Sequence, residues 1–446
     1  SVPLLFDGSL DPDSHFHARL SNEIARSGVV PVWDALSLQG RVYSYPPLLH
    51  VLTGLLSRVT GLDSLLVLKG LGIFIGGLLS ITTFLLARSV SNSTSIGLWS
   101  ALFASVCAIA VWRTAGFTRP DGVALMLIPL ALYLWHTRRD ALAFVLSIAM
   151  VFLHPLSAVV FALLLGTFFL LGLVQKQRVS FWIPVSLGGM LVSFFAWVHS
   201  IGLPLSQYAS PLSLQATELT RFWVLGFVVY FPLSWMFSAY GLVKARLPLV
   251  VWGWVFLTVV IAAFGTRLAM YSIPFLAIVA AYGVVSLLQF FRTQRIFVPA
   301  LTVFVLFIGC VTVYYLMNSQ SPYITPSEHN VVGFLSQHAQ SGESVLTPWD
   351  QGHVVAYYTL LPVVIDGYFE FAHELDARNN ASYDALATSS CETWTRSMDA
   401  FDARYFYLPH DELNGFNVKH GLLELEPCPE MRLLYSSTDA RLYERV

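Results

Sequence analysis

The chain has 446 residues, of which 56% are hydrophobic and only 12% are charged, and its mean hydropathy is +0.64. Soluble globular domains carry about 25% charged residues, so this composition excludes an ordinary soluble protein and predicts an integral membrane protein. The net charge of −2 indicates no nucleic-acid partner.

Apolar segments long enough to cross a bilayer begin at residue 66. Taking about 20 apolar residues as one crossing, we predict about ten spans in a polytopic α-helical bundle, because the segments lack the alternation of membrane strands. They lie within residues 66–87, 96–112, 121–136, 141–153, 155–174, 181–200, 222–242, 249–264, 268–290 and 297–317. His154-Pro155 leaves two alternatives for the fourth and fifth segments, two short crossings or one broken element.

The basic residues predict the orientation of these spans. If all ten cross, the short loops on one side hold basic side chains with Asp140 as their single acid, which is typical of the cytoplasmic side. We therefore expect a plasma-membrane protein with residues 1–65, the intervening outer loops and everything beyond residue 317 outside the cytoplasm. Because Ser1 already lies on that face, we also expect an anchoring span upstream of it.

The first segment, residues 1–65, contains a helix-compatible stretch with polar residues in a regular spacing. Asp13, His17 and Arg19 stand at i, i+4 and i+6, where an acid, an imidazole and a guanidinium can converge on a phosphate. The Asp13 carboxylate can also hold a hard divalent cation. The alternative is a solvated amphipathic helix that Asp11 or Asp13 caps.

Residues 46–62 form a second apolar stretch in this segment, too short and too polar to count as a span. One interpretation places it along the membrane interface. The other is an ordinary helix that starts at Pro46-Pro47, because proline is favoured in the first turn of a helix.

Three charged residues in later outer loops are candidates for the same site. Asp121 follows the 113–120 loop, Glu218 is the only acid of the 201–221 loop, and Arg267 precedes the ninth span. Two carboxylates from separate loops suit a metal ion, and a guanidinium can bind phosphate through two hydrogen bonds. The alternatives are a helix cap for Asp121 and lipid-headgroup contact for Arg267.

Charged and polar residues return near residue 320, so residues 66–317 form the transmembrane bundle and residues 322–446 a small C-terminal α/β domain. We predict strands over 343–347, 362–366 and 403–408, helices over 328–339 and 370–389, and a terminal hairpin of 433–437 with 441–445. The domain also carries the motif Trp349-Asp350-Gln351-Gly352-His353. Cys391 and Cys428 can form a disulfide if their Cα atoms are close enough.

Taken together, these features resemble the catalytic subunit of oligosaccharyltransferase, the archaeal type most closely, within the GT-C class of membrane glycosyltransferases. The resemblance covers most of the chain. It rests on the segments Asp13–Arg19, Gly116–Asp121, Arg267–Pro274 and Trp349–His353, the last of which reads WWDYG in the family.

The resemblance implies a polyprenyl-linked oligosaccharide donor, a divalent metal ion such as Mn²⁺ or Mg²⁺, and transfer of the glycan to Asn in Asn-x-Ser/Thr sequences of a protein or peptide. Asp13 and Asp121 would be the metal ligands, and Glu218 would contact the acceptor amide. Arg267 would bind the donor pyrophosphate, and Trp349 with Asp350 would bind the acceptor hydroxyl.

Departures from the family pattern keep a second function open. Pro348 stands where the family has its first Trp, Gln351 replaces Tyr, and Arg119 replaces an acid. The alternative is a GT-C enzyme that transfers one sugar from a polyprenyl-phosphate carrier to a hydroxyl, with Asp13 as general base and the metal optional. A transporter or a lipid scaffold is disfavoured, because the acids lie in loops and the spans are almost uncharged.

Overall fold

The computed structural model describes residues 12–111, 114, 119–201, 232–262, 266–290, 294–318, 324–368, 372–387, 390–409, 428–437 and 440–446. These residues divide between two compact units. The helical unit holds Pro46–Leu49 and the described part of Leu68–Gln320. The α/β unit holds the described parts of Pro3–Tyr45 and Ser321–Val446, together with His50–Val67, so it combines the predicted first loop with the predicted C-terminal domain.

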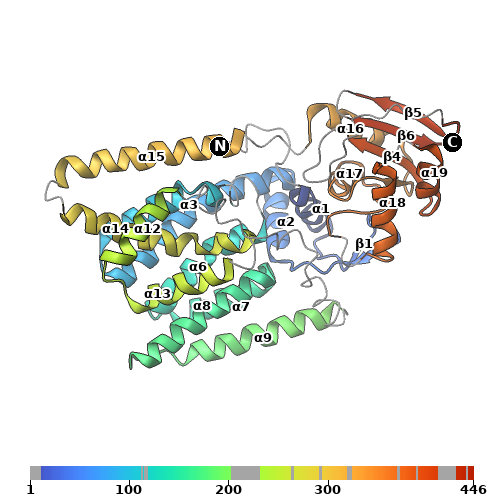
Figure 1. Cartoon of the computed structure of the whole chain (residues 1–446). Helices are drawn as coiled ribbons and strands as arrows, with labels where there is room; N and C mark the ends of the chain where they lie inside the picture. The colour runs from blue at the N-terminus through green and yellow to red at the C-terminus, as the bar shows by residue number, and fades with distance from the viewer. Residues whose placement is uncertain are drawn as a thin grey trace. The chain divides into compact units, whose positions relative to one another are not determined.

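Apolar helices build the helical unit (Figure 1). They are α3 (Ser64–Ser91), α4 (Thr94–Ser105), α5 (Ala108–Val111), α6 (Pro120–His136), α7 (Asp140–Leu153), α8 (Pro155–Val174), α9 (Trp182–Ser200), α12 (Pro232–Lys244), α13 (Leu249–Ala262), the 3₁₀ helix η4 (Thr266–Ser272), α14 (Ile273–Phe290) and α15 (Gln294–Asn318).

Among the described residues, five of these helical segments are long and apolar enough to cross a membrane. They are Ser64–Ser91, Pro155–Val174, Trp182–Ser200, Leu268–Phe290 and Phe297–Tyr314. A predominantly helical chain with candidate membrane spans is thus confirmed, whereas the predicted count of about ten spans is not. The other apolar helices, α6, α7 and α13, are 17, 14 and 14 residues long.

The helix break at His154 has a local cause. Pro155 occupies the first position of α8, where its missing N–H costs nothing, and His154 adopts an extended backbone between α7 and α8. The Nδ1 atom of His154 accepts the backbone N–H of Ser157 at 3.2 Å and so caps α8. The segment 141–174 therefore forms two helices rather than one bent helix.

Helix packing in this unit depends on glycine where two backbones approach closely. A Cβ on Gly283 of α14 would lie 2.1 Å from the carbonyl oxygen of Phe237 on α12. A Cβ on Gly241 of α12 would lie 2.5 Å from that of Val279. Small residues allow this approach, which is typical of helix pairs in membranes.

The α/β unit begins with α1 (Pro12–Ser27), the short strands β1 (Trp33–Asp34) and β2 (Arg41–Val42), and α2 (Leu48–Thr60). Its C-terminal part contains α16 (Pro326–His338), β3 (Ser344–Leu346), α17 (Gly352–Thr359), α18 (Leu375–Ala387), α19 (Cys391–Asp399), β4 (Ala403–Pro409), β5 (Met431–Ser436) and β6 (Ala440–Arg445). The sheet order is β3-β4-β6-β5, with β3 parallel to β4 and the other pairs antiparallel. The predicted terminal hairpin is β5–β6.

Alternating side chains of β4 build a core on each face of this sheet. Tyr405 and Tyr407 pack with residues of α16 and α17, whereas Phe406 and Leu408 pack with residues of α18 and α19. Because successive side chains of a strand point to opposite faces, the unit has three layers, with two helices on each side of the sheet. Figure 1 shows α18 and α19 beside the strands.

The first loop extends this sheet. The backbone N–H of Leu38 donates to the carbonyl of Val363 at 2.9 Å, and the N–H of Val363 donates to the carbonyl of Leu36 at 2.9 Å. Val363 also pairs with Val345 of β3. The predicted strand 362–366 is therefore a short bridge between β3 and the first loop, which ties residues 36–38 to the C-terminal part of the chain.

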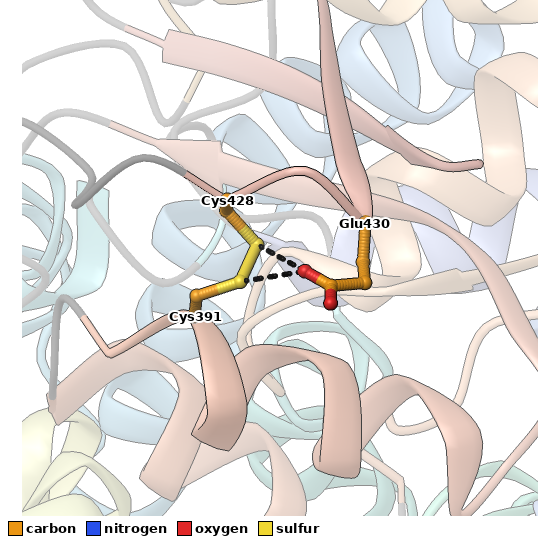
Figure 2. Close-up of side chains that lie close together, drawn as sticks. All are labelled: Cys391, Cys428 and Glu430. Carbon is orange, nitrogen blue, oxygen red and sulfur yellow. Dashed lines mark hydrogen bonds between the residues drawn. A yellow bond between two sulfur atoms is a disulfide. The ribbon is translucent and has the colours of Figure 1, made fainter.

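A disulfide joins Cys391, at the start of α19, to Cys428, just before β5. Figure 2 shows the bond and the carboxylate of Glu430, whose Oε2 lies 3.2 Å from the sulfur of Cys391 and 3.8 Å from that of Cys428. Since a disulfide has no S–H to donate, we describe these as close contacts. The bond connects the helix layer to the sheet.

Replacing both cysteines, Cys391→Ser with Cys428→Ser, should lower the unfolding free energy of the α/β unit by about 2–4 kcal/mol, because the bond closes a loop of 37 residues. Thermal unfolding in detergent, followed by fluorescence, measures the loss. Cys310→Ser is the matched control, since Cys310 is a free and exposed thiol. An unchanged melting temperature in the double variant would contradict the expectation.

Candidate active site

Helix α1 places Asp13 in its first turn and buries the residues that follow. An acid in the first turn is favoured by the helix dipole, and Asp13 itself is partly exposed. Residues 14–21 are all buried, including the predicted phosphate ligands His17 and Arg19. The alternative of a solvated amphipathic helix therefore does not describe α1.

Gly367 brings Asp13 next to the C-terminal motif. A Cβ on Gly367 would lie 2.9 Å from Nε2 of His353 and 3.6 Å from Oδ1 of Asp13. The first-loop acid and the last residue of the Trp349–His353 motif thus border the same small space. Only a residue without a side chain leaves this space open.

Gly352, inside the motif, makes a second close approach. A Cβ there would lie 2.2 Å from the carbonyl oxygen of Ile365 and 2.8 Å from Cα of Asp366. The start of α17 therefore rests directly on the backbone of residues 365–366. This contact explains why the motif requires glycine at this position.

A buried network of ion pairs holds these segments together. The guanidinium of Arg19 donates two hydrogen bonds to the carboxylate of Asp34, at 2.7 and 2.8 Å. Arg41 donates to Asp34 at 3.0 Å and to the two carboxylate oxygens of Asp366 at 2.7 and 2.6 Å. None of these side chains is more than 6% exposed. Positive and negative groups alternate, so each buried charge faces an opposite one.

This geometry favours a structural role for Arg19, because both terminal nitrogens of its guanidinium bind Asp34. Contact of Arg19 with the donor phosphate stays a prediction. Removing one partner of a buried ion pair typically costs about 3–5 kcal/mol, since the other charge is left without compensation. The network therefore fixes α1 against residues 365–368, where the backbone N–H of Tyr368 also donates to Asp366.

The surroundings shift the pKa values of three of these groups. Burial raises the pKa of a carboxyl, but at Asp34 the positive charges of Arg19 and Arg41 outweigh burial and lower it. At Asp366 burial is likewise outweighed, chiefly by Arg41, and the pKa is lowered. Burial lowers the pKa of His353 to about 4, against the opposing effect of Asp366. His353 is therefore neutral at neutral pH.

His17 belongs to a second buried cluster, in which aromatic rings surround two histidines. Its Nδ1 lies 2.8 Å from Nε2 of His50, and its Nε2 lies 3.4 Å from the hydroxyl of Tyr368. One proton placed between the two imidazoles satisfies both facing nitrogens. Phe16 and Tyr45 contact the ring of His17. These contacts link Tyr368, His17 and His50 side chain to side chain.

The remaining predicted site residues are placed as follows. Trp349 and Asp350 are half-buried directly before α17. Asp121 is fully buried in the first turn of α6, in the helical unit, and its Oδ1 accepts the N–H of Gly122 at 2.9 Å. Glu218 lies outside the described residues. Arg267 lies in η4, but its side chain is outside the described part of the chain.

The structure adds residues that sequence analysis missed. Asp34, Arg41 and Asp366 form the ion network with Arg19, and Gly367 lies between Asp13 and the His353 that the motif already contained. One signal existed for the last group, since Asp366-Gly367 directly follows the apolar run Val363–Ile365, at the end of a predicted strand. No local pattern marks Asp34 or Arg41.

Within the described residues, one group of three side chains comes close enough to share a metal ion, namely Cys391, Cys428 and Glu430. The two sulfurs form a disulfide and are not thiolates, so the group does not suit a metal ion in this state. The carboxylates of Asp13 and Asp121 are the hard oxygen donors that Mn²⁺ and Mg²⁺ prefer. Each carboxylate therefore has the chemistry that the predicted ion requires, and their binding of one shared ion stays a prediction.

No protein-family model and no curated protein matches the chain. Solved structures do match. Archaeal oligosaccharyltransferase AglB from Archaeoglobus fulgidus, in complex with an inhibitory peptide and a dolichol-phosphate, has a TM-score of 0.67 at 13% identity, over 90% of this chain and 65% of AglB. ArnT from Cupriavidus metallidurans, bound to undecaprenyl phosphate, has a TM-score of 0.64 at 15% identity, over 98% and 94% of the two chains. This chain has the GT-C glycosyltransferase fold.

A further structure with this fold is the arabinofuranosyltransferase AftD from Mycobacteria, with a TM-score of 0.54 at 12% identity, over 98% of this chain and 38% of AftD. The chain spans slightly less than two thirds of AglB and almost the whole of ArnT. In this GT-C fold the α/β unit carries Asp13 and the Trp349–His353 motif, and the helical unit carries Asp121.

The substitution Gly367→Ala should destabilise the α/β unit by about 1–3 kcal/mol, because the added methyl group overlaps His353. Thermal unfolding of the purified protein measures the change. Gly333→Ala in α16 is the matched control. A Cβ there meets nothing within 4 Å, so alanine should stabilise the helix by about 0.5–1 kcal/mol. Equal effects of the two substitutions would contradict the assigned contact.

The stability of the α/β unit should fall as the pH falls from 6.5 toward 4. In that range the unfolded chain protonates His353, whose ordinary pKa is 6.5, whereas the folded chain does not until about pH 4. The unfolding free energy should therefore decrease by about 3 kcal/mol, and His353 contributes no pH dependence above 6.5. Below the ordinary carboxyl pKa of 3.8, protonation of Asp34 and Asp366 in the unfolded chain lowers it further.

Melting temperatures measured between pH 8 and pH 3 test this expectation. The variant His353→Gln, which cannot titrate, should lose the slope between pH 6.5 and pH 4 and keep the one at lower pH. A wild-type melting temperature that is constant from pH 7 to pH 4.5 would show that His353 is not buried in its neutral form.

Proposed function

We propose that the protein transfers a glycan from a polyprenyl-linked donor to an acceptor, in a site built around Asp13. One observation carries this proposal. The Asp13 carboxylate lies beside Gly367 and His353, next to the Trp349–His353 motif, in a chain with a GT-C fold. The first-loop acid and the C-terminal motif are thus neighbours in the fold although they lie far apart in the sequence.

A lipid-linked donor is supported by two of the similar structures. AglB is in complex with a dolichol-phosphate, and ArnT is bound to undecaprenyl phosphate. In this chain, Arg267 in η4 would bind the phosphate of such a donor, because a guanidinium matches phosphate through two hydrogen bonds. His17, in the buried histidine cluster, would contribute a further polar contact.

For the acceptor we propose Asn in an Asn-x-Ser/Thr sequence. AglB has been solved with a tethered acceptor peptide that contains an NVT sequon. Asp350 and Trp349 are half-buried before α17, where the Asp350 carboxylate can accept a hydrogen bond from a Ser or Thr hydroxyl. Because an amide nitrogen is a weak nucleophile, acidic groups must orient its N–H bonds, and Asp13, Asp121 and Glu218 would do so.

A divalent cation, Mn²⁺ or Mg²⁺, would be held by the carboxylates of Asp13 and Asp121. When bound, it would neutralise the charge that develops on the departing phosphate group. An AglB structure is a complex with Zn and sulfate. Asp13 is well suited to hold such a cation, because α1 is fixed in position by the Arg19–Asp34 pair.

A second candidate is the transfer of a single sugar to a hydroxyl of a lipid, a glycan or a protein. The fold matches ArnT with a TM-score of 0.64 and AglB with a similar score of 0.67, so the fold supports this enzyme type as well. Pro348 and Gln351 also depart from the oligosaccharyltransferase motif. In this reaction Asp13 would take the proton of the hydroxyl as a general base, and a metal ion would be optional.

We further propose that the protein resides in the plasma membrane and that its α/β unit lies on the side away from the cytoplasm. The disulfide between Cys391 and Cys428 supports this side, because disulfides persist in oxidising compartments. The polyprenyl-linked donor and the acceptor would then be used on that face.

The proposed reaction should depend on Asp13 and on a divalent cation. We expect full-length protein in detergent, supplied with a polyprenyl-linked glycan extract and a fluorescent Asn-x-Thr peptide, to form glycopeptide with Mn²⁺ and not with EDTA. Asp13→Asn should lower the rate by about 100-fold or more, since it removes a charge from the reacting centre. Gel mobility of the peptide measures the product.

Asp376→Asn is the matched control, because Asp376 is an exposed acid in α18 and undergoes the same change of charge. Its rate should equal that of the wild type. If no glycopeptide forms although the extract serves another oligosaccharyltransferase, the sequon role is wrong. Sugar transfer to a lipid or glycan hydroxyl in the same extract would then support the second candidate.

A further inference from the structure

Helix α2 exposes a mostly apolar face and buries a face of mostly small or polar side chains. Four of its exposed side chains, Leu52, Leu55, Leu56 and Val59, stand at i, i+3, i+4 and i+7 and form one continuous apolar stripe. Apart from Leu49, the side chains on its buried face are small or polar. They are His50, Thr53, Gly54 and Ser57. In an aqueous environment this distribution would be reversed.

A neighbouring loop adds to this apolar surface. Val29, Val32 and Trp33 are 65%, 77% and 52% exposed, directly after α1. A Cβ on Gly28 would lie 3.2 Å from Nη1 of Arg58, so the start of the loop touches the last turn of α2. We call the α2 stripe and residues 29–33 together the apolar patch. The patch combines two segments of the α/β unit.

The chain itself places this patch close to the bilayer. Three residues, 61–63, separate the end of α2 from the start of α3, the first helix long enough to cross a membrane. The first turn of α3, Ser64–Val67, belongs to the same compact unit as α2. Asp63 caps that turn by accepting the N–H of Leu65 at 2.8 Å and also accepts the hydroxyl of Tyr357 on α17 at 2.6 Å. Three linking residues reach about 10 Å at most, so the patch lies near the point where α3 enters lipid.

Charge and residue type match the same environment. Arg58, in the last turn of α2, and Arg26, at the end of α1, are exposed cations beside the patch. Such cations bind the phosphates of lipid headgroups, and a tryptophan such as Trp33 is favoured at the boundary between hydrocarbon and water. A protein partner would have to cover a stripe that already lies next to the membrane.

We propose that the apolar patch is a membrane-docking surface, with Leu55, Val59 and the 29–33 loop inserted among the acyl chains just below anionic headgroups. The surface also fixes the height of α1, because α2 packs closely on it. A Cβ on Gly54 would lie 2.8 Å from the carbonyl oxygen of Ser21. If the proposed function holds, docking keeps Asp13 near the level of the donor phosphate.

Fluorescence quenching tests the docking surface without any donor or acceptor, so its result is independent of the proposed reaction. In the full chain with Cys107→Ser and Cys310→Ser, single cysteines are introduced as Leu55→Cys, Val59→Cys and Val32→Cys and labelled with a polarity-sensitive dye. The protein is placed in nanodiscs of equal parts phosphatidylcholine and phosphatidylglycerol. Quenchers are a nitroxide near the top of the lipid chain and aqueous iodide.

Labels at the three patch positions should be quenched by the lipid nitroxide roughly twofold or more and be protected from iodide. Two controls bracket this result. Asn379→Cys, exposed on α18, should respond to iodide alone, and Ser57→Cys, on the buried face of α2, should respond to neither. Patch labels that respond to iodide would show a solvated surface, and labels that respond to neither quencher would show a protein-covered one. Either result overturns the proposal.

Discussion

The buried ion network of Arg19, Asp34, Arg41 and Asp366 is the interaction on which the α/β unit depends. It joins α1, through Asp34 and Arg41, to Asp366, which lies 325 positions after Arg41 in the sequence. Other contacts between the first loop and the C-terminal part are the 36–38 bridge, the hydrogen bonds of Arg378 to Leu38 and of Tyr357 to Asp63, and ring contacts. The partners alternate in charge, so each buried charge is compensated. Because Arg19 and Asp13 lie in the same helix, the network also holds the segment that carries Asp13 in place.

Much of the fold could be predicted from the sequence, because lipid imposes strong rules on it. Long uncharged segments must be helices in lipid. The terminal hairpin is predicted from the alternation of apolar and polar residues within two short neighbouring segments. The helix from Asp13 and the break at His154 also follow from local signals. The number of membrane crossings could not be predicted from the sequence, because helices such as α7 are shorter than the thickness of one bilayer.

The candidate site was predictable only where a motif marks it. Asp13 and the Trp349–His353 segment stand out in the sequence, whereas Asp34 and Arg41 resemble ordinary loop charges. Their importance arises because Arg41 binds both Asp34 and Asp366, and no local sequence pattern indicates a pairing across most of the chain. Gly367 is similar, because a glycine after a strand usually marks a turn, and only the structure shows His353 and Asp13 on either side of it.

An ionic connection suits this position in the chain for a physical reason. Next to a bilayer, an apolar contact between two protein segments has little preference over contact with lipid, so it cannot specify one arrangement. A guanidinium held by two carboxylates has a fixed geometry and no substitute in hydrocarbon. The outward face of α2 is apolar, while the buried side of α1 carries Arg19 and polar side chains beside the apolar Phe16 and Leu20. We infer that lipid supplies attachment, and that the ion network supplies the register of α1 against residues 365–368.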